Sequence, residues 1–320
     1  MIEQGKRILL AGASGYIGTA VATSLHKAGF QVTALVRDPA TAPAECDVIE
    51  SSTDDQQTLK NAIGSLSFDG VISCIASRSG VAEDAWRVDC QGNRHLLAAA
   101  QKAGAQHFVL LSAICVQQPK LAFQRAKLTF EAELKASSLI WSIVRPTAFF
   151  KSLSGQVERV RNGKPYLIFG DGALNSCKPI SEADLAAYLV SCLTEPHLHN
   201  RTLPIGGPGP ALTPKQQGLL LHAAFNKPPK FKQVPTAIFN IAAALLKPLG
   251  RISPALAAKA ELAKIGHYYA THSMLKWDEN RECYDAKATP ETGTDTLKAH
   301  FERLVHNGMA GQEAGQQKLF

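Results

Sequence analysis

The fold is decided by a short stretch near the start of the chain, RILLAGASGYIG, residues 7–18. Its apolar beginning predicts a strand, and three glycines follow at positions 12, 15 and 18. With this spacing Gly12 permits a tight turn, Gly15 lets the backbone approach a pyrophosphate, and Gly18 lets a helix pack closely on the strand. Because the triad follows a strand and opens a helix, it predicts a dinucleotide-binding βαβ unit.

The helix that opens at this loop also predicts how the cofactor is held. Its first amides, including those of Tyr16 and Ile17, lie at the positive end of the helix dipole and are expected to bind the phosphates. At the end of the second strand an NAD site would carry an acid for the ribose hydroxyls, whereas this chain has Arg37. An arginine provides a charge-assisted fork for a 2′-phosphate, and Ser14 adds a hydroxyl. NADPH is therefore the predicted cofactor, and the alternative is an exposed arginine beside Asp38.

The rest of the first half alternates apolar strands with amphipathic helices, which is typical of a parallel sheet with crossover helices. Further strands are expected at residues 31–37, 70–76, 107–114 and 141–146. A helix is expected over residues 93–105, with Gly104 as its stop. The fold class is therefore α/β, a Rossmann-type doubly wound parallel sheet, with residues 1–150 as the NADP-binding domain.

The second half of the chain has a different composition. Residues 161–181 are rich in turn-forming residues and predict a hairpin or a lobe folded over the sheet edge. A helix over residues 182–193 and a strand over residues 201–207 follow, so about 178–207 is expected to return to the main sheet. Residues 151–320 are therefore expected to form a smaller, interleaved C-terminal lobe that binds the substrate.

Composition narrows the classes of partner. The chain has 320 residues, 45% of them hydrophobic, which is ordinary for a globular protein. Its net charge is +7, and the basic residues are dispersed along the chain. This pattern favours small anionic ligands or an acidic surface over nucleic acid, and the alternative is a merely solvated basic surface.

The cysteines and the start of the chain bear on the compartment. Seven cysteines without C-x-x-C spacing, and no clustered histidines, predict reduced thiols and neither a disulfide framework nor a metal site. The chain enters a strand within a few residues, which leaves no room for a signal or transit peptide. We therefore expect a bacterial, cytoplasmic protein.

No apolar run reaches the roughly 18–20 residues needed to cross a bilayer. The closest run is AIFNIAAALL, residues 237–246, which contains Asn240 and ends before Lys247 and Pro248. We expect a buried helix there. The alternative is a substrate-facing helix or one in peripheral contact with a membrane surface.

Longer motifs carry a resemblance to a known family. The glycine loop resembles the atypical extended short-chain dehydrogenase/reductases, the branch that includes NmrA-like proteins. Other stretches, from about residue 7 to residue 320, are similar to the divinyl chlorophyllide a 8-vinyl-reductases. They include HFVLLSAICVQQP (107–119), FQRAKLTFEAEL (123–134), SIVRPTAFFKSLSGQVE (142–158), GKPYLIFGDG (163–172), CKPISEADLA (177–186), LPIGGPGPALTPKQQG (203–218) and GMAGQEAGQQKLF (308–320). One position departs from the family: Ser52 stands at the tip of the third strand, where plant members carry Asp.

The resemblance implies that NADPH reduces the 8-vinyl group of divinyl chlorophyllide a, or of its protochlorophyllide relative, to an ethyl group in chlorophyll or bacteriochlorophyll biosynthesis. The substrate is a flat magnesium tetrapyrrole with a propionate. In short-chain dehydrogenases a tyrosine acid usually stands four residues before the helix lysine, here Lys127, but this chain has Phe123. A vinyl group has no carbonyl oxygen to neutralise, so Phe123 is compatible with catalysis and offers the ring an apolar surface. Hydride is expected at the terminal vinyl carbon, and water or a weak acid then protonates the inner carbon.

Other residues near the cofactor follow from the same resemblance. Lys127 is expected to bond the nicotinamide ribose; the alternative is a surface lysine paired with Glu131. Ser112 ends a strand, where it either faces the nicotinamide or caps the strand. Ala76 and Ser77 fall where backbone lines the cofactor.

Candidate substrate contacts follow the strand at residues 141–146. Phe149 and Phe150 are expected to sandwich the ring at the carboxyl edge of the sheet, with a core position as the alternative for each. Lys151 or Lys178 is expected to pair with the propionate. Tyr166, Tyr268 and Tyr269 are candidate distant acids and His267 a candidate magnesium ligand, although structural roles are favoured for these four.

Two rival functions remain open from the sequence. A non-catalytic NADP-sensing regulator or a photosystem-assembly factor would use the same fold, because fold does not fix function. A reductase of phenylpropanoid alkenes is the second rival, but it would not explain the second-half motifs.

Overall fold

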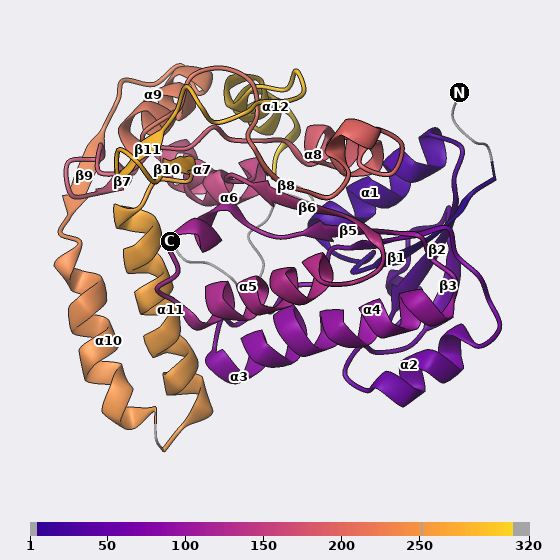
Figure 1. The fold of residues 1–320 in the computed structure, drawn as a ribbon. Helices are drawn as coiled ribbons and strands as arrows, with labels where there is room; N and C mark the ends of the chain where they lie inside the picture. Colours follow the sequence, from indigo (N-terminus) through magenta and orange to yellow (C-terminus); the bar gives the residue numbers. More distant parts are fainter. Residues whose placement is uncertain (1–4, 251, 310–320) are drawn as a thin grey trace.

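The computed structural model describes residues 5–250 and 252–309, so most of the closing motif GMAGQEAGQQKLF lies outside the described residues. Its centre is a seven-stranded sheet with the order β3-β2-β1-β4-β5-β6-β8, in which every pair is parallel (Figure 1). The strands are β1 (Arg7–Ala11), β2 (Gln31–Val36), β3 (Asp47–Glu50), β4 (Gly70–Ser73), β5 (His107–Leu111), β6 (Ile140–Pro146) and β8 (Arg201–Ile205). The reversal of strand order at β1 and β4 confirms the predicted Rossmann-type fold class.

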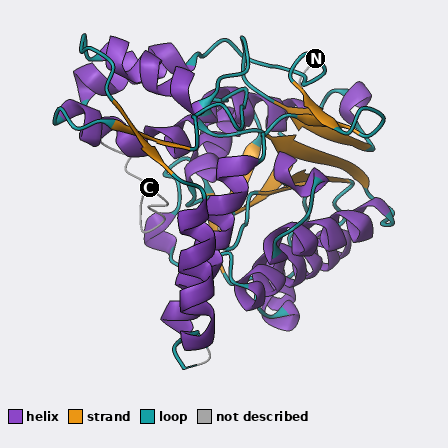
Figure 2. Ribbon diagram, turned by 90° about the vertical axis from the view of Figure 1, so that its left-hand side faces the viewer, coloured by secondary structure: helices purple, strands orange, loops and turns teal. Residues whose placement is uncertain are grey.

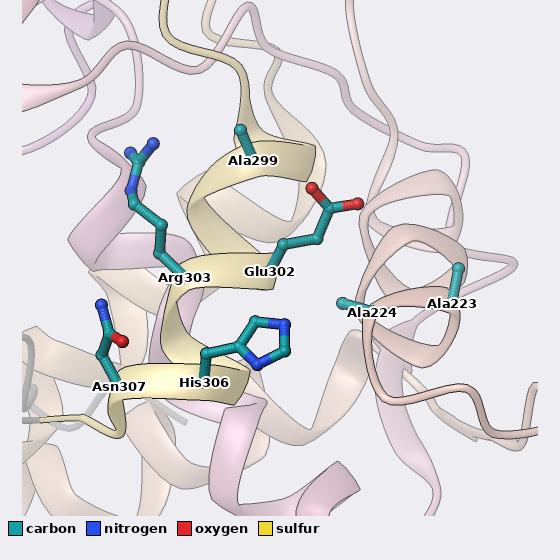
Figure 3. Close-up of a pocket in the computed structure, with 7 residues that line it drawn as sticks. All are labelled: Ala223, Ala224, Ala299, Glu302, Arg303, His306 and Asn307. Carbon is teal, nitrogen blue, oxygen red and sulfur yellow. The ribbon is translucent and has the colours of Figure 1, made fainter.

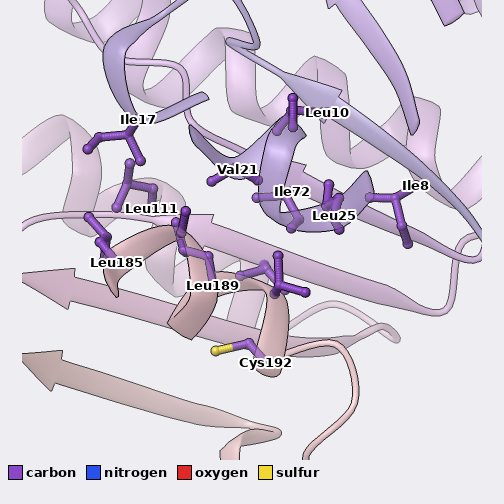
Figure 4. Packing of buried hydrophobic residues seen from close by; sticks show 14 of the residues in the cluster. Ile8, Leu10, Ile17, Val21, Leu25, Ile72, Leu111, Leu185, Leu189 and Cys192 are labelled. Atoms are coloured by element: carbon purple, nitrogen blue, oxygen red, sulfur yellow. The ribbon is translucent and has the colours of Figure 1, made fainter. Parts of the chain in front are cut away.

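Helices cover both faces of the sheet, and alternate strand residues point to opposite sides, so each inner strand contributes side chains to two buried clusters. Ile8 and Leu10 of β1 pack with α1 (Tyr16–Lys27) and α8 (Glu182–Ser191), as Figure 4 shows. Leu9 and Ala11 lie in a second cluster on the other side. The helices of that side are α2 (Gln56–Ile63), α4 (Asn93–Lys102) and α5 (Ala122–Lys135).

One helix of this layer is irregular. α3 (Ala82–Ala85) runs into η2 (Trp86–Gly92), a π-helical segment, and then directly into α4. Short π-helical segments within α-helices are frequent at functional sites. The buried side chain of Asp89, in this segment, lies toward α5.

The segment expected to return to the main sheet contributes α8 and β8. β8 pairs with β6 from Ser142↔Arg201 to Pro146↔Ile205, so the second half of the chain supplies an edge strand to the first half's sheet. The boundary near residue 150 remains a prediction.

The second lobe contains two small sheets. β7 (Tyr166–Phe169) pairs in parallel with β9 (Phe231–Val234), so residues 161–181 belong to a lobe and not to a hairpin. β10 (Lys276–Asp278) and β11 (Cys283–Asp285) form the other sheet. The lobe's helices are α6 (Phe150–Leu153), α7 (Val157–Arg161), α9 (Pro214–Ala224) and α12 (Leu297–Asn307). Short 3-10 turns occur at η1 (Pro39–Thr41), η3 (Ile114–Gln117), η4 (Ser154–Gln156) and η5 (Pro196–Leu198).

A pair of helices, α10 (Ala237–Leu249) and α11 (Pro254–Thr271), extends along one side of the molecule (Figures 1 and 2). α11 faces the body of the protein, and α10 lies outside it. The prediction of a buried helix over residues 237–246 is wrong, since no side chain of α10 is buried. Its apolar residues are covered on one side, by α11 and, at Phe239, by Phe169 of β7. Within the described residues, no helix is long and apolar enough to span a membrane.

Candidate active site

The glycine loop between β1 and α1 has the predicted geometry. Gly12 has a φ of +80°, which glycine adopts without strain, and a Cβ atom there would lie 2.8 Å from the carbonyl carbon of Cys74. A Cβ atom on Gly18 would lie 2.0 Å from the Gly12 carbonyl oxygen. The first glycine therefore permits the turn and the third permits the close contact of helix and strand.

The N-terminus of α1 fits an anionic ligand. Gly15 is its N-cap residue, no side chain caps the helix, and the first turn contains no acidic residue. Ser14 and Gly15 are exposed, whereas Ile17 is buried and contributes only its backbone. The Tyr16 hydroxyl donates a 2.5 Å hydrogen bond to Glu182, which ties the loop to α8. Exposed amides at the positive end of a helix suit a pyrophosphate.

Arg37 directly follows β2 and is exposed at the sheet edge. Ser52, the position that departs from the family pattern, donates a 2.6 Å hydrogen bond to Asp54. This hydrogen bond lowers the pKa of Asp54, and the charges of Arg87 and Arg37 lower it further. The charge of Arg37 therefore acts on a carboxylate in the loop after β3. The exposed position of Arg37 is compatible with a contact to a 2′-phosphate.

Lys127 of α5 forms an ion pair with Asp89 that was not predicted from the sequence. Its Nζ lies 2.9 Å from Asp89 Oδ1, and the Asp89 side chain is fully buried. Asp89 also accepts a 2.6 Å hydrogen bond from the Ser77 hydroxyl and a 3.3 Å bond from the Ser77 amide. One buried carboxylate therefore fixes both the lysine and the loop after β4.

Ser112 belongs to a second buried network. Its hydroxyl donates a 2.6 Å hydrogen bond to Glu131 Oε1, and Glu131 also accepts from Arg145 of β6. Glu131 is therefore not the partner of Lys127, which was the alternative considered from sequence. The Ser112 hydroxyl therefore donates its proton to Glu131, and a contact of Ser112 with the nicotinamide stays a prediction.

Phe123 lies at the start of α5, partly buried, in a cluster with the loop after β5 and with α11. The cluster has a buried centre of Cys115, Leu121, Ile265 and Tyr268, against which Ala113, Phe123, Leu262 and Tyr269 pack. α11 is hydrogen-bonded to this loop, because the Tyr268 hydroxyl donates to the carbonyls of Cys115 and Gln118. The position of the missing tyrosine therefore faces a helix of the second lobe.

The four predicted substrate residues fall in different environments. Phe150 is fully buried, with its ring centroid 5.1 Å from that of His300, so it supports the lobe and has no face free for stacking. Lys178 is buried, and its Nζ lies 3.1 Å from Glu291. Phe149 is only partly buried, and the Lys151 ammonium lies 4.7 Å from the Tyr16 ring centroid. Phe149 and Lys151 therefore adjoin the cofactor loop, whereas Phe150 and Lys178 are held inside the protein by His300 and Glu291.

The candidate acids are also separated. Tyr166 is buried in the second lobe among the residues around Phe150, and burial raises its pKa. Tyr268 and Tyr269 lie in the Phe123 cluster. His267, considered as a magnesium ligand, has its Nε2 3.4 Å from the Asn240 amide nitrogen of α10.

A surface pocket lies away from all these residues. It is formed by α9 and α12, and its lining residues include Glu302, Arg303 and His306 (Figure 3). None of the predicted site residues lines it. The carboxyl edge of the parallel sheet, where ligands bind in open α/β folds, is the better candidate site.

Comparisons with known proteins identify the family of the chain. A family model described as NAD(P)H-binding matches residues 12–196. The divinyl chlorophyllide a 8-vinyl-reductase, chloroplastic, of Arabidopsis thaliana is 46% identical over 330 residues, covering 97% of this chain and 79% of that protein. The protein of the same name from Oryza sativa subsp. indica is 46% identical and covers 98% of this chain and 82% of its own length.

A solved structure supports the fold alone. The NADPH-dependent quinone oxidoreductase of Escherichia coli, in complex with NADPH, aligns with a TM-score of 0.68 at 21% identity, covering 93% of this chain and 99% of that chain.

These comparisons correct one expectation. A bacterial, cytoplasmic protein was predicted from the start of the chain, but four relatives at 46% identity are named as chloroplastic plant proteins. The match covers only 79–82% of each of them, so the point at which this chain begins carries no information about the compartment. That prediction was wrong.

The family model covers more than half of the chain, and the relatives match both the cofactor half and the second lobe. The chain therefore belongs to the NAD(P)H-binding family and, within it, to the divinyl chlorophyllide a 8-vinyl-reductases.

Proposed function

We propose that this protein is an NADPH-dependent oxidoreductase that reduces the 8-vinyl group of divinyl chlorophyllide a, or of divinyl protochlorophyllide a, to an ethyl group. The observation that carries the proposal is the 46% identity over 97% of the chain, since it includes the lobe expected to bind the substrate. The reaction belongs to chlorophyll biosynthesis, and to bacteriochlorophyll biosynthesis in a host that makes that pigment.

The residues present fit the cofactor. Gly12 and Gly18 leave a backbone cradle that side chains would fill, and the uncapped start of α1 presents the amides of Tyr16 and Ile17. Ser14 and Arg37 are exposed and available to a 2′-phosphate, and Ala76 and Ser77 line the next loop. When bound, NADPH supplies the hydride for the reduction.

Lys127 is the residue we expect to orient the nicotinamide ribose. The Asp89 carboxylate fixes its ammonium, and the lysine side chain remains 11% exposed. Because Asp89 also holds Ser77, the lysine and the loop after β4 keep a constant separation. Ser112 acts one step further away, through Glu131 and Arg145, by holding the end of β5 in place.

For the tetrapyrrole we propose a position over the carboxyl edge of β4 to β6, against Phe123 and Phe149. Lys151 lies beside the cofactor loop and carries the charge that a propionate requires. Lys178 and Phe150 are buried, and we expect them to support the residues that contact the ring from the protein interior.

The test is anaerobic incubation of the purified protein with NADPH and divinyl chlorophyllide a. A gain of two hydrogens by mass and a blue shift of the Soret band are expected, and divinyl protochlorophyllide a is run in parallel. Tight NADPH binding without turnover of either pigment would contradict the proposal. It would favour the non-catalytic NADP-sensing regulator, which the relatives' names do not favour.

We further propose peripheral contact with an anionic membrane surface through the outer face of α10. The face is defined by Ile238, Ile241, Leu245, Leu249 and the following Ile252, whose exposed fractions are 51, 58, 66, 46 and 85%. Residues 227–264 contain seven Lys and Arg residues and one Glu, nearly the whole net charge of the protein. An apolar helix face within a basic segment suits the boundary of anionic headgroups and acyl chains.

Vesicle flotation tests this contact. The protein is expected to float with vesicles that contain anionic lipid, less with neutral ones, and not after Ile241→Asp with Leu245→Asp. Equal flotation of the double variant would contradict the contact, and a shift to dimers at high concentration would assign the face to a second copy of the chain.

A further inference from the structure

We propose that Tyr269 of α11 donates the proton that completes the reduction, in place of the tyrosine that α5 lacks. This inference rests on the proposed reductase function. It assigns a catalytic role to a residue that lies 146 positions after Phe123 and on a different lobe.

The site needs a proton donor at this end of α5. In the usual arrangement of the fold a phenol stands one helical turn before the lysine, but Phe123 has no hydroxyl. Two phenols of α11, those of Tyr268 and Tyr269, join the same cluster as Phe123, Ala113 and Cys115. A hydroxyl from the second lobe thus enters the region that the first lobe leaves apolar.

α11 is firmly attached to the loops that end β4 and β5. Ile265 packs so closely on Gly80 that a Cβ atom there would lie 2.4 Å from the Ile265 Cδ1 atom. The Asn175 amide donates a 2.7 Å hydrogen bond to the Tyr269 carbonyl, which fixes the backbone at the candidate acid. The position of Tyr269 relative to the carboxyl edge of the sheet is therefore set by several independent contacts.

The two neighbouring tyrosines differ in what their hydroxyls do. Tyr268 is 3% exposed, and its hydroxyl donates to the carbonyls of Cys115, at 2.8 Å, and Gln118, at 3.1 Å. Tyr269 is only partly buried, and its hydroxyl lies 3.6 Å from Cys115 Sγ, a long and weak contact. Tyr268 is thus a structural clasp, whereas the Tyr269 hydroxyl makes a weak contact with a thiol, which a substrate would displace more easily.

The electrostatic surroundings keep the phenol protonated until it is used. Burial raises the pKa of Tyr269 well above its usual value, and the adjacent Cys115 adds to the effect. Burial also raises the pKa of the Cys115 thiol, while the Lys127 ammonium opposes that shift, so the positive charge of Lys127 is felt at the cluster.

The proposed reduction adds one hydride and one proton to the vinyl group. When bound, the cofactor would supply a hydride to the terminal vinyl carbon and leave as NADP⁺, so that the π electron pair would move to the inner carbon and the macrocycle. The O–H bond of Tyr269 breaks as a C–H bond forms at the inner carbon, so the electron pair of the O–H bond stays on the phenolate oxygen. One proton from solvent then restores the phenol, giving a net uptake of one hydride and one proton.

The experiment compares Tyr269→Phe with Tyr268→Phe as the matched control, using divinyl chlorophyllide a and NADPH. Tyr269→Phe is expected to lower kcat on the order of 10²-fold, as loss of a general acid does, with unchanged Kd for NADPH and unchanged thermal midpoint. Its kcat is also expected to show a larger solvent isotope effect and a smaller isotope effect from deuterated NADPH, because protonation becomes rate-limiting. Tyr268→Phe is expected to lower the thermal midpoint with little change in either isotope effect.

A second measurement is independent of whether the Phe variant folds. Incorporation of 3-fluorotyrosine at position 269 keeps the ring and makes the phenol more acidic, so the basic limb of the kcat–pH profile is expected to move to lower pH. An unmoved limb, or full kcat with unchanged isotope effects in Tyr269→Phe, would overturn the assignment. Loss of kcat in Cys115→Ala with Tyr269→Phe still active would transfer the role to the thiol. Absence of turnover in the unsubstituted protein would instead reject the proposed function itself.

Discussion

The cofactor loop and the α10–α11 helix pair both border the proposed site, but they are built in opposite ways. At the cofactor loop the contacts are backbone against backbone, as at Gly12 and Gly18, and the neighbouring lysine is fixed by the fully buried Asp89. In the helix pair the contacts are between apolar side chains, and α10 has no buried residue. The difference indicates that the cofactor loop is rigid, and so is α11, which hydrogen bonds fix to the body of the protein, whereas the outer helix α10 can adjust by side-chain repacking.

The largest effect is expected at Lys127. Lys127→Met removes the ammonium and leaves Asp89 buried without its ion-pair partner, so kcat is expected to fall on the order of 10²–10³-fold. Steady-state rates with divinyl chlorophyllide a measure the loss. Lys135→Met, on the exposed last turn of the same helix, is the matched control. If Lys127→Met and Lys135→Met both retain full activity, the ion pair of Lys127 and Asp89 has no catalytic role.

The inner helix of the pair is expected to be the next most sensitive. Ile265 is 7% exposed, so Ile265→Ala is expected to lower the free energy of unfolding by about 2–4 kcal/mol through a cavity against Gly80. Ile241→Ala, at 58% exposure on the outer helix, is expected to cost less than about 0.5 kcal/mol. Denaturant unfolding compares the two. Equal costs would mean that α10 is covered in solution, for example by a second copy of the chain.

Gly18→Ala tests the backbone contact directly. A Cβ atom 2.0 Å from the Gly12 oxygen forces helix and strand apart, and overpacking of this kind costs about 1–3 kcal/mol, which corresponds to about 5- to 150-fold in Kd for NADPH. Isothermal titration measures it. The loss is expected mainly in binding, with kcat at saturating NADPH changed severalfold at most. A large loss of kcat at saturation would show that the loop also positions the nicotinamide.

The same contrast separates the parts of the fold that the sequence predicts from those that it does not. The glycine loop and the strands beginning at Arg7, Gln31, Gly70 and His107 were predicted because local spacing and apolar runs determine them. β3 has only Ile49 buried, so its place came from the family resemblance and not from periodicity. Elements that depend on local sequence alone are the predictable ones.

The rest depended on contacts between distant residues. Nothing in WRVDCQG, residues 86–92, indicates that Asp89 meets Lys127 38 positions later, or that Glu131 binds Ser112 and Arg145. Burial of α10 was predicted wrongly because an apolar composition does not reveal which face the fold covers. The side-chain roles at the candidate site therefore needed the structure.

Arg37→Gln is expected to have a smaller effect. Arg37 is exposed, so solvent screens its charge, and the preference for NADPH over NADH is expected to fall about tenfold, or about 1.4 kcal/mol. The ratio of kcat/KM for the two cofactors measures it, and Arg78→Gln, an exposed arginine on the loop after β4, is the control. An unchanged ratio would leave Ser14 or the loop backbone as the determinant. The cofactor region would then discriminate by shape and not by charge.

The smallest expected effect concerns the far end of the sheet, at His107, the first residue of β5. Burial lowers the pKa of His107 to about 4, below its usual 6.5. The unfolded chain therefore binds more protons than the folded one between these values, so stability is complete above about pH 6.5 and is lost as the pH falls toward 4. From pH 7 to pH 6 this one residue is expected to cost somewhat under 1 kcal/mol.

Urea unfolding at both pH values measures this cost, and His107→Gln removes the group so that the difference between the two proteins isolates it. His199 stands edge-on to His107 with ring centroids 4.4 Å apart, and burial also lowers its pKa, so His199→Gln is expected to act in the same direction. His107 lies at the start of β5, whereas Ser112 and the proposed site follow its end. The His107→Gln protein should therefore lose pH dependence of stability and keep the pH profile of kcat, because the rigid sheet separates the two ends. A shifted kcat profile would mean that the sheet transmits protonation at one edge to chemistry at the other.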